Sequence, residues 1–512
     1  MIAGDILGER ARLTPDKLAL VYPPTGECFT FAQLDDRSRK CALLWTKVAG
    51  QIKGDRVGIL AHNCVEYIDA FFAAAKSGII IVPLNSRLTA GELEGIVRDS
   101  GVCALMYERQ FSDVVSALST ATKLDCCIVL DGPNQDHLDY RALMHDLNGA
   151  EWRNFACAPE DIHCLLYTSG TTGKPKGVMV PHRMVLWNAY NTTMCWQLRE
   201  DDVSPIFTPL CHAGGLTVFL TALFAIGGTI VLHRGFDAAE IWRTIQVERC
   251  TVVMGVPTIY KLLMEAPEFE KVSLDSVRWF ISGGAPLPLY IIKAYQRRGV
   301  TLKQGYGLTE VGVNCFTMTA ADSCVKLGSI GKPMMFTEAR LLANDGSAAN
   351  GDETGELCLR GPHVCRGYWN SPEPTSAALD ADGWFHTGDL ARCDEDGFFY
   401  IVGRAKDMLI SGGINVYPAE IEAELVLHPD VKDAAVVGVP HDTWGEIGVA
   451  FVVQREGAML TSDGLAKFLS ERLAKFKVPR DFVFIENLPR TPYGKVIKRE
   501  LQEQYVREKA GA

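Results

Sequence analysis

The sequence lacks the short cysteine and histidine patterns that mark metal sites. None of its 16 cysteines is followed by another three positions later, and there is no HExxH motif or Cys/His cluster with zinc spacing. Disulfide frameworks are typical of short secreted chains, whereas this chain has 512 residues. We therefore predict reduced cysteines that pack as small apolar side chains, and no structural metal.

An excess of positive charge is also missing. The chain has 51 Lys and Arg against 62 Asp and Glu, which gives a net charge of −11, and it contains no basic stripe. Because proteins hold the phosphates of nucleic acids with clustered Lys and Arg, we predict no nucleic-acid partner.

Long apolar runs and targeting signals are absent too. The most apolar stretch, 217–232 (TVFLTALFAIGGTIVL), is shorter than a membrane span and is interrupted by two glycines. It predicts a buried helix, a turn and a strand, and no integral membrane segment. The first residues, MIAGDILGERARL, are acidic where a secretory signal has a basic end and an apolar run, so we expect a cytoplasmic protein.

What is present is the composition of a folded, soluble protein. Apolar residues make up 47% of the chain and charged residues 22%, and the length suits several folding units. Short β-rich runs alternate with helical patterns, which is typical of α/β sheets that bind ligands at the carboxyl ends of their strands. The runs are RVGIL (56–60), CALMY (103–107), CCIVL (126–130), TIVLH (229–233), CTVVMGV (250–256), VRWFIS (277–282) and VTLKQGYG (300–307).

The C-terminal part of the chain shows a different sequence pattern. From about Gly355 the expected strands are shorter and joined by hairpin-like turns such as Asp396-Gly397. A separate α+β unit is predicted near Arg404, with helices over 418–427 and 462–476. We expect two domains, 1–403 and 404–512.

The strongest local signal is the segment 167–179, YTSGTTGKPKGVM. It combines hydroxyls, glycines and lysines, which are the residue types that surround a phosphate with donors and positive charge. It is not a Walker A loop, because only two residues separate Gly170 from Gly173 and Pro175 follows Lys174. The P-loop NTPase interpretation therefore fails on spacing.

This segment resembles the signature of the acyl-adenylate-forming superfamily, which includes acyl-CoA synthetases, peptide-synthetase adenylation domains and beetle luciferases. The resemblance extends to the C-terminus. The further matching motifs are PLCHAGG (209–215), SGGAPL (282–287), QGYGLTE (304–310), WFHTGDL (384–390), GRAKDMLISGGINVYPAEIE (403–422) and PRTPYGK (489–495).

The resemblance implies a fold and an ATP site. The fold would be α/β, with a large N-terminal region of sheets flanked by helices, a small β-barrel-like subdomain and a small mobile α+β C-terminal domain. The residues implied for binding ATP or AMP are Thr168, Ser169, Gly170, Thr171, Thr172, Gly173, Lys176, Gly284, Ala285, Gln304, Gly305, Tyr306, Thr309, Asp389, Arg404 and Lys495.

Roles within this site are implied in the same way. The segments 284–285 and 304–306 would surround adenine, while Asp389 and Arg404 would contact ribose. Thr309 would meet the α-phosphate, and Glu310 would hold the Mg²⁺ that accompanies ATP.

The implied catalytic residues are Lys495, Glu310, Lys176 and Thr309. Lys495 would approach the acid carboxylate and the α-phosphate, where a cation offsets the repulsion between two anions. In isolation it would be one of many surface lysines.

The acyl and CoA sites follow from the same comparison. His212, Ala213, Gly214 and Gly283 would line the acyl side, Gly412 and Gly413 the pantetheine passage, and Lys406 would be the hinge of the C-terminal domain. A plain turn is an equal explanation for the Gly412-Gly413 pair. The implied pocket segments 187–188, 213–217, 283–284 and 311–314 contain no Arg or Lys, which disfavours dicarboxylic acids because a second carboxylate needs a buried cation.

The predicted activity is that of an acyl-CoA synthetase acting on an apolar acid, a fatty acid or an aryl or alicyclic acid. Mg·ATP and the acid would give acyl-AMP and pyrophosphate, and CoA would then displace AMP. A stand-alone enzyme that loads a carrier protein and a silent nucleotide-binding protein on the same fold remain alternatives. A homodimer is compatible with the sequence.

Overall fold

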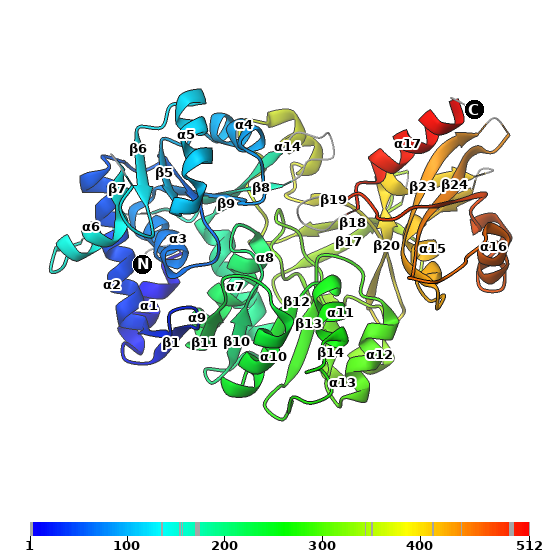
Figure 1. Cartoon of the computed structure of the whole chain (residues 1–512), viewed down its shortest axis with the longest axis horizontal. Coiled ribbons are helices and arrows are strands. Elements are labelled where there is room, and N and C mark those ends of the chain that lie inside the picture. The colour runs from blue at the N-terminus through cyan, green and yellow to red at the C-terminus, as the bar shows by residue number, and fades with distance from the viewer. Residues whose placement is uncertain are drawn as a thin grey trace. The chain divides into compact units, whose positions relative to one another are not determined.

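The computed structural model describes residues 4–134, 137–152, 155, 157–168, 175–343, 345–349, 352–411, 414–441, 443–490 and 496–510 (Figure 1). The chain forms two compact units. The first comprises Met1–Ala339 and Leu359–His386, and the second comprises Arg340–Cys358 and Thr387–Ala512. No helix among the described residues is long and apolar enough to cross a membrane.

The first unit contains a seven-stranded sheet, in the order β7-β6-β5-β3-β4-β8-β9. Its neighbouring strands are parallel except for the antiparallel pair β8 and β9. The strands are β3 (Arg56–Leu60), β4 (Ile80–Leu84), β5 (Ala104–Tyr107), β6 (Cys126–Val129), β7 (Leu138–Asp139), β8 (Ile162–Thr168) and β9 (Lys176–Pro181). The helices between and after them are α3 (Val65–Ser77), α4 (Ala90–Ser100), α5 (Ser112–Ala121) and α6 (Tyr140–Asp146).

The ends of these helices follow from local chemistry. Helix α4 starts at a capping box in which Thr89 and Glu92 satisfy each other's backbone N–H groups. Helix α3, which is buried along almost its whole length, stops at Gly78, whose φ of +70° favours glycine. An added Cβ at Gly78 would lie 2.9 Å from the Lys53 side chain, so glycine is also required for space.

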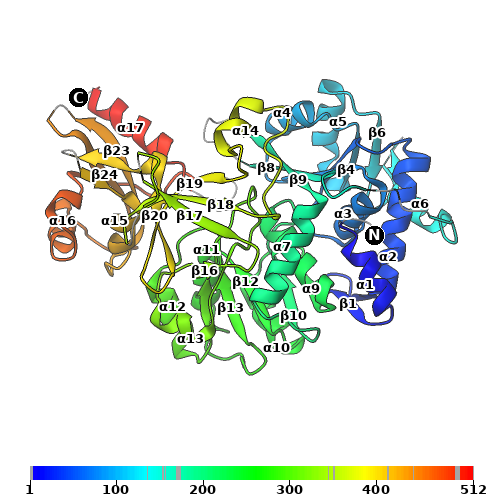
Figure 2. The same ribbon diagram turned by 180° about the vertical axis from the view of Figure 1, so that it is seen from behind.

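A second sheet has the order β10-β11-β1-β2. Its strands are β1 (Leu18–Tyr22), β2 (Glu27–Thr30), β10 (Val203–Ile206) and β11 (Thr229–Leu232). The associated helices are α1 (Ile6–Leu13), α2 (Phe31–Leu43), η1 (Leu44–Val48), α7 (His182–Cys195), α8 (Ala213–Gly215), η3 (Leu216–Leu220) and α9 (Thr221–Ile226); α7 and α9 pack side by side (Figure 2).

A third, fully parallel sheet has the order β12-β13-β14. Its strands are β12 (Val252–Gly255), β13 (Trp279–Ser282) and β14 (Leu302–Gln304), joined by α11 (Pro257–Glu265) and α12 (Leu289–Arg297) and preceded by α10 (Ala238–Val247). Beyond them are α13 (Ala320–Val325) and the pair β15 (Phe316–Thr317) and β16 (Lys332–Pro333).

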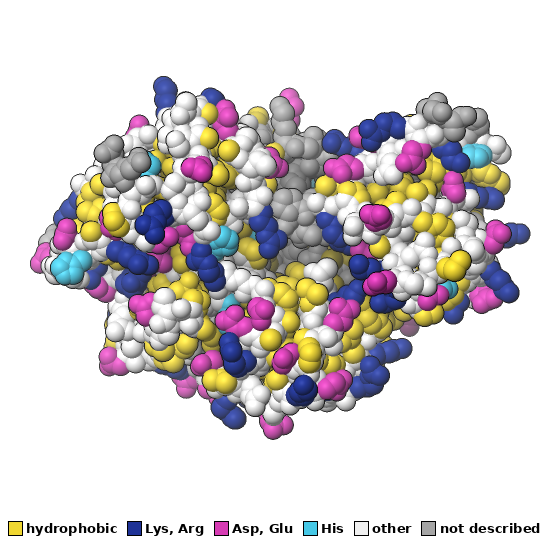
Figure 3. Space-filling view, viewed as in Figure 1, with side chains coloured by type: hydrophobic (Ala, Val, Ile, Leu, Met, Phe, Trp, Pro, Cys, Tyr) yellow, Lys and Arg dark blue, Asp and Glu magenta, His cyan; other side chains and the backbone are white. Residues whose placement is uncertain are grey.

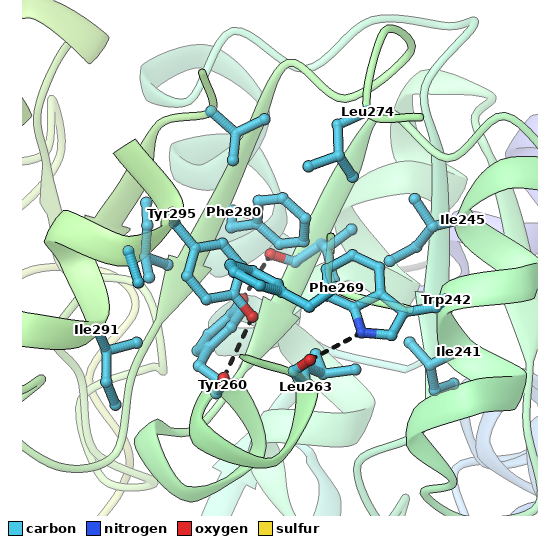
Figure 4. Close-up of a cluster of buried hydrophobic side chains, with 14 of the residues drawn as sticks. Ile241, Trp242, Ile245, Tyr260, Leu263, Phe269, Leu274, Phe280, Ile291 and Tyr295 are labelled. Atoms are coloured by element: carbon cyan, nitrogen blue, oxygen red, sulfur yellow. Dashed lines mark hydrogen bonds between the residues drawn. The ribbon is translucent and has the colours of Figure 1, made fainter. Parts of the chain in front are cut away.

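The aromatic core beside this sheet keeps its polar atoms satisfied (Figure 4). Trp242 donates its indole N–H to the carbonyl of Leu263 at 2.9 Å, and the Tyr260 hydroxyl donates to the carbonyl of Ile281 at 2.8 Å. The Tyr295 hydroxyl in turn donates to the Tyr260 carbonyl. Because buried polar groups without partners are costly, these bonds let large aromatic side chains fill the core.

Four strands lie where the two units meet along the chain, in the order β17-β18-β19-β20. They are β17 (Glu338–Leu342), β18 (Gly355–Arg360), β19 (Phe385–Cys393) and β20 (Phe399–Arg404), and α14 (Pro372–Ala378) lies between β18 and β19 in sequence. The resemblance led us to expect a small barrel-like subdomain. The described strands instead form an open sheet, since no pairing joins β17 to β20 among them.

The rest of the second unit is an α+β domain, as predicted. Its sheet has the order β22-β21-β24-β23, with β25 also paired to β24. The elements are η4 (Ala405–Asp407), β21 (Leu409–Ser411), β22 (Ile414–Val416), α15 (Pro418–Leu425), β23 (Val431–His441), β24 (Gly445–Gln454), α16 (Ser462–Ser470), η5 (Lys475–Lys477), β25 (Asp481–Phe484) and α17 (Lys498–Ala510).

Along β23 and β24, successive apolar side chains point to opposite faces of the sheet and belong to two separate cores. Val436 and Val452 belong to the core that includes helices α15 and α16, whereas Val437 and Phe451 belong to the core that includes Leu501 of α17. A period of two, with apolar residues on both faces, is what a sheet covered on both sides requires. The sheet therefore supports helices on either face.

The main fold prediction is confirmed: the protein is a mixed α/β structure with a larger N-terminal and a smaller C-terminal part. The run 217–232 forms a helix to Ile226, a turn at Gly227 and strand β11, as expected. On the face in Figure 3, Lys and Arg side chains are interspersed with Asp and Glu.

A buried histidine pair gives the N-terminal unit a predictable response to acid. Nδ1 of His163 and Nδ1 of His182 lie 3.2 Å apart, and both side chains are fully buried. Burial lowers the pKa of His182 to about 4, with Asp161 opposing and Lys53 adding to the shift. The pKa of His163 lies well below its usual value, because the side chain is buried and His182 is close to it.

We predict that stability falls as the pH drops from about 6.5 to about 4, because the unfolded chain takes up protons that the folded chain excludes. The loss from His182 alone is about 3 kcal/mol in free energy of unfolding. Thermal midpoints across this pH range should fall less steeply in His182→Asn than in the wild type. The exposed control His145→Asn should keep the wild-type slope, and equal slopes in all three proteins would contradict the prediction.

Candidate functional site

The glycine-rich signature lies at a hairpin of the seven-stranded sheet. Thr168 ends β8 and pairs with Lys176, the first residue of β9. The predicted phosphate-binding residues Ser169, Gly170, Thr171, Thr172 and Gly173 lie outside the described residues. The two ends of the loop are thus held together by strand pairing.

A second group of predicted residues gathers at one edge of the three-stranded sheet. Gly255, Ser282 and Gln304 are register partners at the carboxyl ends of β12, β13 and β14. The segments 283–287 and 305–310 leave the sheet there, as expected for a ligand-binding edge. Gly305 donates its N–H to the Ser282 carbonyl at 2.7 Å, which ties the two segments together.

The predicted adenine-side residues form the walls of this edge. Gln304 is buried, and its amide oxygen accepts from the N–H of Leu287 while its amide nitrogen donates to the carbonyl of Gly328. Gly284, with a φ of +82°, and Ala285 are exposed, and the Tyr306 ring packs edge-on against Phe316. An exposed backbone and an aromatic ring are both types of surface on which a flat base can lie.

Glu310 and Lys176 are brought to the same side chain, Tyr368. The Tyr368 hydroxyl donates to Oε1 of Glu310 at 3.1 Å, and the Lys176 ammonium lies 4.9 Å from the centre of the Tyr368 ring. Nearby, the Glu310 carbonyl accepts from the N–H of Cys365 at 2.8 Å. A carboxylate and an ammonium from two motifs that are distant in sequence therefore both contact the side chain of Tyr368.

Strand-like pairing with β9 positions Tyr368 next to Lys176 and Glu310. The segment 366–369 runs beside β9: Tyr368 is bridged to Val178, and Trp369 donates its N–H to the Gly177 carbonyl at 2.7 Å. Tyr368 is not among the site residues predicted from the sequence. Nothing in the local sequence marks it, because its position depends on pairing with a strand almost two hundred residues away.

Glu310 fits the role predicted for a magnesium ligand. A carboxylate has several acceptor positions and is a ligand type that hard cations prefer, and Tyr368 bonds one oxygen of Glu310. The bond from Cys365 holds the Glu310 backbone, and the bond from Tyr368 would fix the direction of the carboxylate.

One of the four predicted acyl-side residues lines a small cavity in the first unit. Ala213 lines it, together with Thr217, Thr309 and Gly312. His212 directly precedes helix α8, and its carbonyl accepts from the N–H of Gly215. Gly214 is half-buried, and Gly283 follows β13.

In the second unit, Asp389 and Arg404 form an ion pair. They are register partners on β19 and β20, and Arg404 donates from Nε to Oδ1 of Asp389 at 3.0 Å. Asp389 is 5% exposed. The sequence predicted both residues for one ribose, and the hairpin brings them together.

Four other predicted residues remain, and the structure describes one of them. Lys406 is exposed in the single turn η4 (Ala405–Asp407) that follows β20. Gly412, Gly413 and Lys495 lie outside the described residues.

Comparison with known proteins decides the family. The model of the AMP-binding enzyme family matches residues 7–369, and that of its C-terminal domain matches residues 420–495. The chain belongs to the AMP-binding enzyme family. The resemblance to acyl-adenylate-forming enzymes is thereby confirmed, as is the prediction that the protein is an enzyme.

Full-length relatives support the same assignment. A feruloyl-CoA synthase from an Amycolatopsis species is 37% identical over 498 residues, covering 97% of both chains. The long-chain-fatty-acid–CoA ligase FadD13 of Mycobacterium tuberculosis is 36% identical, covering 98% of both. The structure of the o-succinylbenzoate CoA synthetase MenE from Bacillus subtilis, in complex with the acyl-adenylate intermediate OSB-AMP, matches with a TM-score of 0.86 at 30% identity over 98% of both chains.

We predict that Tyr368→Phe impairs use of Mg·ATP in this family member, because it removes the hydroxyl that orients Glu310 and leaves the ring beside Lys176. A hydrogen bond to a charged group is worth enough to lower kcat/KM for Mg·ATP roughly tenfold. Acid-dependent pyrophosphate release at varied Mg·ATP measures this. Tyr190→Phe, at an exposed tyrosine of α7, is the matched control, and unchanged kinetics in Tyr368→Phe with an intact thermal midpoint would contradict the role.

Proposed function

We propose that this chain is an AMP-forming acid:CoA ligase that activates an apolar carboxylic acid with Mg·ATP. The observation that carries the proposal is the meeting of Lys176 and Glu310, from two separate motifs, at Tyr368. A cation and a carboxylate that both lie against one tyrosine suit a polyphosphate and its counterion.

In the first step, the substrate carboxylate attacks the α-phosphorus of ATP, and the bond to pyrophosphate breaks. Lys176 and the donors of the 168–173 loop would bind the phosphates, Thr309 would contact the α-phosphate, and Lys495 would neutralise the approaching carboxylate. Mg²⁺, held by Glu310, would supply further charge neutralisation to the phosphates. Asp389 and Arg404 would hold the ribose hydroxyls.

In the second step, the thiolate of CoA attacks the carbonyl carbon of the acyl-AMP, and AMP leaves with the oxygen that joined the two. We propose that the C-terminal domain begins at Arg404 and turns about Lys406 between the steps. Gly412 and Gly413 would then line the pantetheine passage, with His212 near the thioester site.

The acid is proposed to be mainly apolar. Leu166, Val180, Met184 and Val185 line the cavity beside Thr309, and no Lys or Arg is among its lining residues. A second carboxylate there would lack a counterion. The names of the relatives, which include a feruloyl-CoA synthase and a long-chain-fatty-acid–CoA ligase, support an aryl or alkyl acid and CoA as the acceptor.

The direct test is product analysis with Mg·ATP, CoA and a panel of alkyl, aryl and alicyclic acids, with malonate included. We expect AMP, pyrophosphate and a thioester that depend on an apolar acid. Thioester formed with a carrier protein but not with CoA would support the loading enzyme. The absence of AMP with every acid would support a silent nucleotide-binding protein, and a preference for malonate would contradict the apolar pocket.

We also predict that Lys495→Ala lowers the rate of adenylate formation at least ~100-fold, because removing one electrostatic donor to the reacting phosphate has effects of that order. The exposed control Lys509→Ala should retain the wild-type rate. Burst measurements of pyrophosphate isolate this step, and an unchanged burst in Lys495→Ala would defeat the assignment.

A further inference from the structure

Asn188 on helix α7 carries a buried hydrogen-bond acceptor without a partner. The residue is 2% exposed, and its side-chain oxygen Oδ1 makes no hydrogen bond within the described part of the chain. An unsatisfied buried carbonyl costs free energy and calls for an explanation at the site where it lies.

The orientation of this amide is fixed by its other end. The side-chain nitrogen of Asn188 donates to the carbonyl of Thr217 at 2.7 Å. A carbonyl can only accept, so the nitrogen must face Thr217 and the oxygen must face the other way. A Cβ added to Gly312 would lie 3.0 Å from Oδ1, so glycine at position 312 keeps the space in front of the oxygen clear.

Asn188 and Gly312 both line the cavity that also touches Thr309. The cavity has room for about one water-sized group, about 10 Å³, within about 250 Å³ of empty space that includes open solvent. Most of its other walls are aliphatic, and Met184 offers an unbranched side chain that can move aside for a larger ligand. The cavity is therefore mainly apolar, and it contains an acceptor that has no partner among the described residues.

We propose that Asn188 is a specificity-determining residue, and that the preferred acid carries one hydrogen-bond donor, a hydroxyl or an N–H group, on an otherwise apolar body. This inference rests on the proposed ligase function. The donor group would occupy the cavity and donate to Oδ1 of Asn188. A site built around a buried acceptor rejects an analogue without the donor, because the acceptor is then left unpaired.

The test compares kcat/KM for thioester formation with matched acids. Cinnamate is set against its meta- and para-hydroxy and amino derivatives, and octanoate against its ω-hydroxy derivative. We expect the wild type to prefer at least one donor-bearing acid roughly 10- to 100-fold over its unsubstituted partner. The methyl ethers, which cannot donate, should lose that preference. Comparison of the hydroxy with the amino derivatives shows whether a hydroxyl or an N–H group is the preferred donor.

Two variants locate the effect. Asn188→Leu, of similar size, should abolish the preference for the donor-bearing acid while still activating the unsubstituted one. Thr217→Val, which changes another polar residue of the same cavity, should keep it. The preference is a ratio of two kcat/KM values measured on the same protein, so a partial loss of stability in a variant does not change it. The comparison with methyl ethers is made on the wild type and needs no variant.

Each outcome is decisive. If a water molecule satisfies Asn188, the wild type should show no preference for the donor-bearing acid. If the donor binds elsewhere, Asn188→Leu should keep the wild-type preference. Either result would overturn this inference and leave the proposed ligase function standing. If no acid of any kind gives AMP, the proposed function fails and this inference fails with it.

Discussion

The candidate site depends on the register of three short parallel strands. Gly255, Ser282 and Gln304 are paired at the ends of β12, β13 and β14, so the loops that follow leave the sheet at one level. The hydrogen bond from Gly305 to Ser282 then fixes the segment that carries Thr309 and Glu310. A slip of one residue in β14 would turn every side chain of that strand to the opposite face and would displace both residues.

The close packing of the loop after β14 follows from the same constraint. A Cβ at Gly307 would lie 2.3 Å from the backbone of Val313, so only glycine permits the turn that returns the chain to Gly312. That return places Gly312 in front of Asn188, while Glu310 of the same loop accepts a hydrogen bond from Tyr368. The phosphate side and the acyl side of the proposed site are thus built from one loop.

Much of this arrangement is readable from the sequence, and the exceptions have physical causes. Strand β3 coincides with the run 56–60, and the helix, turn and strand of 217–232 follow from apolar runs bounded by glycines. The motif residues were expected by resemblance, but Tyr368 was not, because tertiary pairing with β9 positions it. The unpaired oxygen of Asn188 is likewise a property of packing, since the sequence does not reveal which atom of an amide is already bonded.

The central claim is that an acyl-adenylate joins the two half-reactions, and the path of one oxygen atom tests it most directly. The acid is labelled with heavy oxygen in its carboxylate, turned over with Mg·ATP and CoA, and the products are analysed by mass spectrometry. An acyl-AMP intermediate transfers one labelled oxygen from the carboxylate to AMP. Label in inorganic phosphate or pyrophosphate, with none in AMP, would contradict the account.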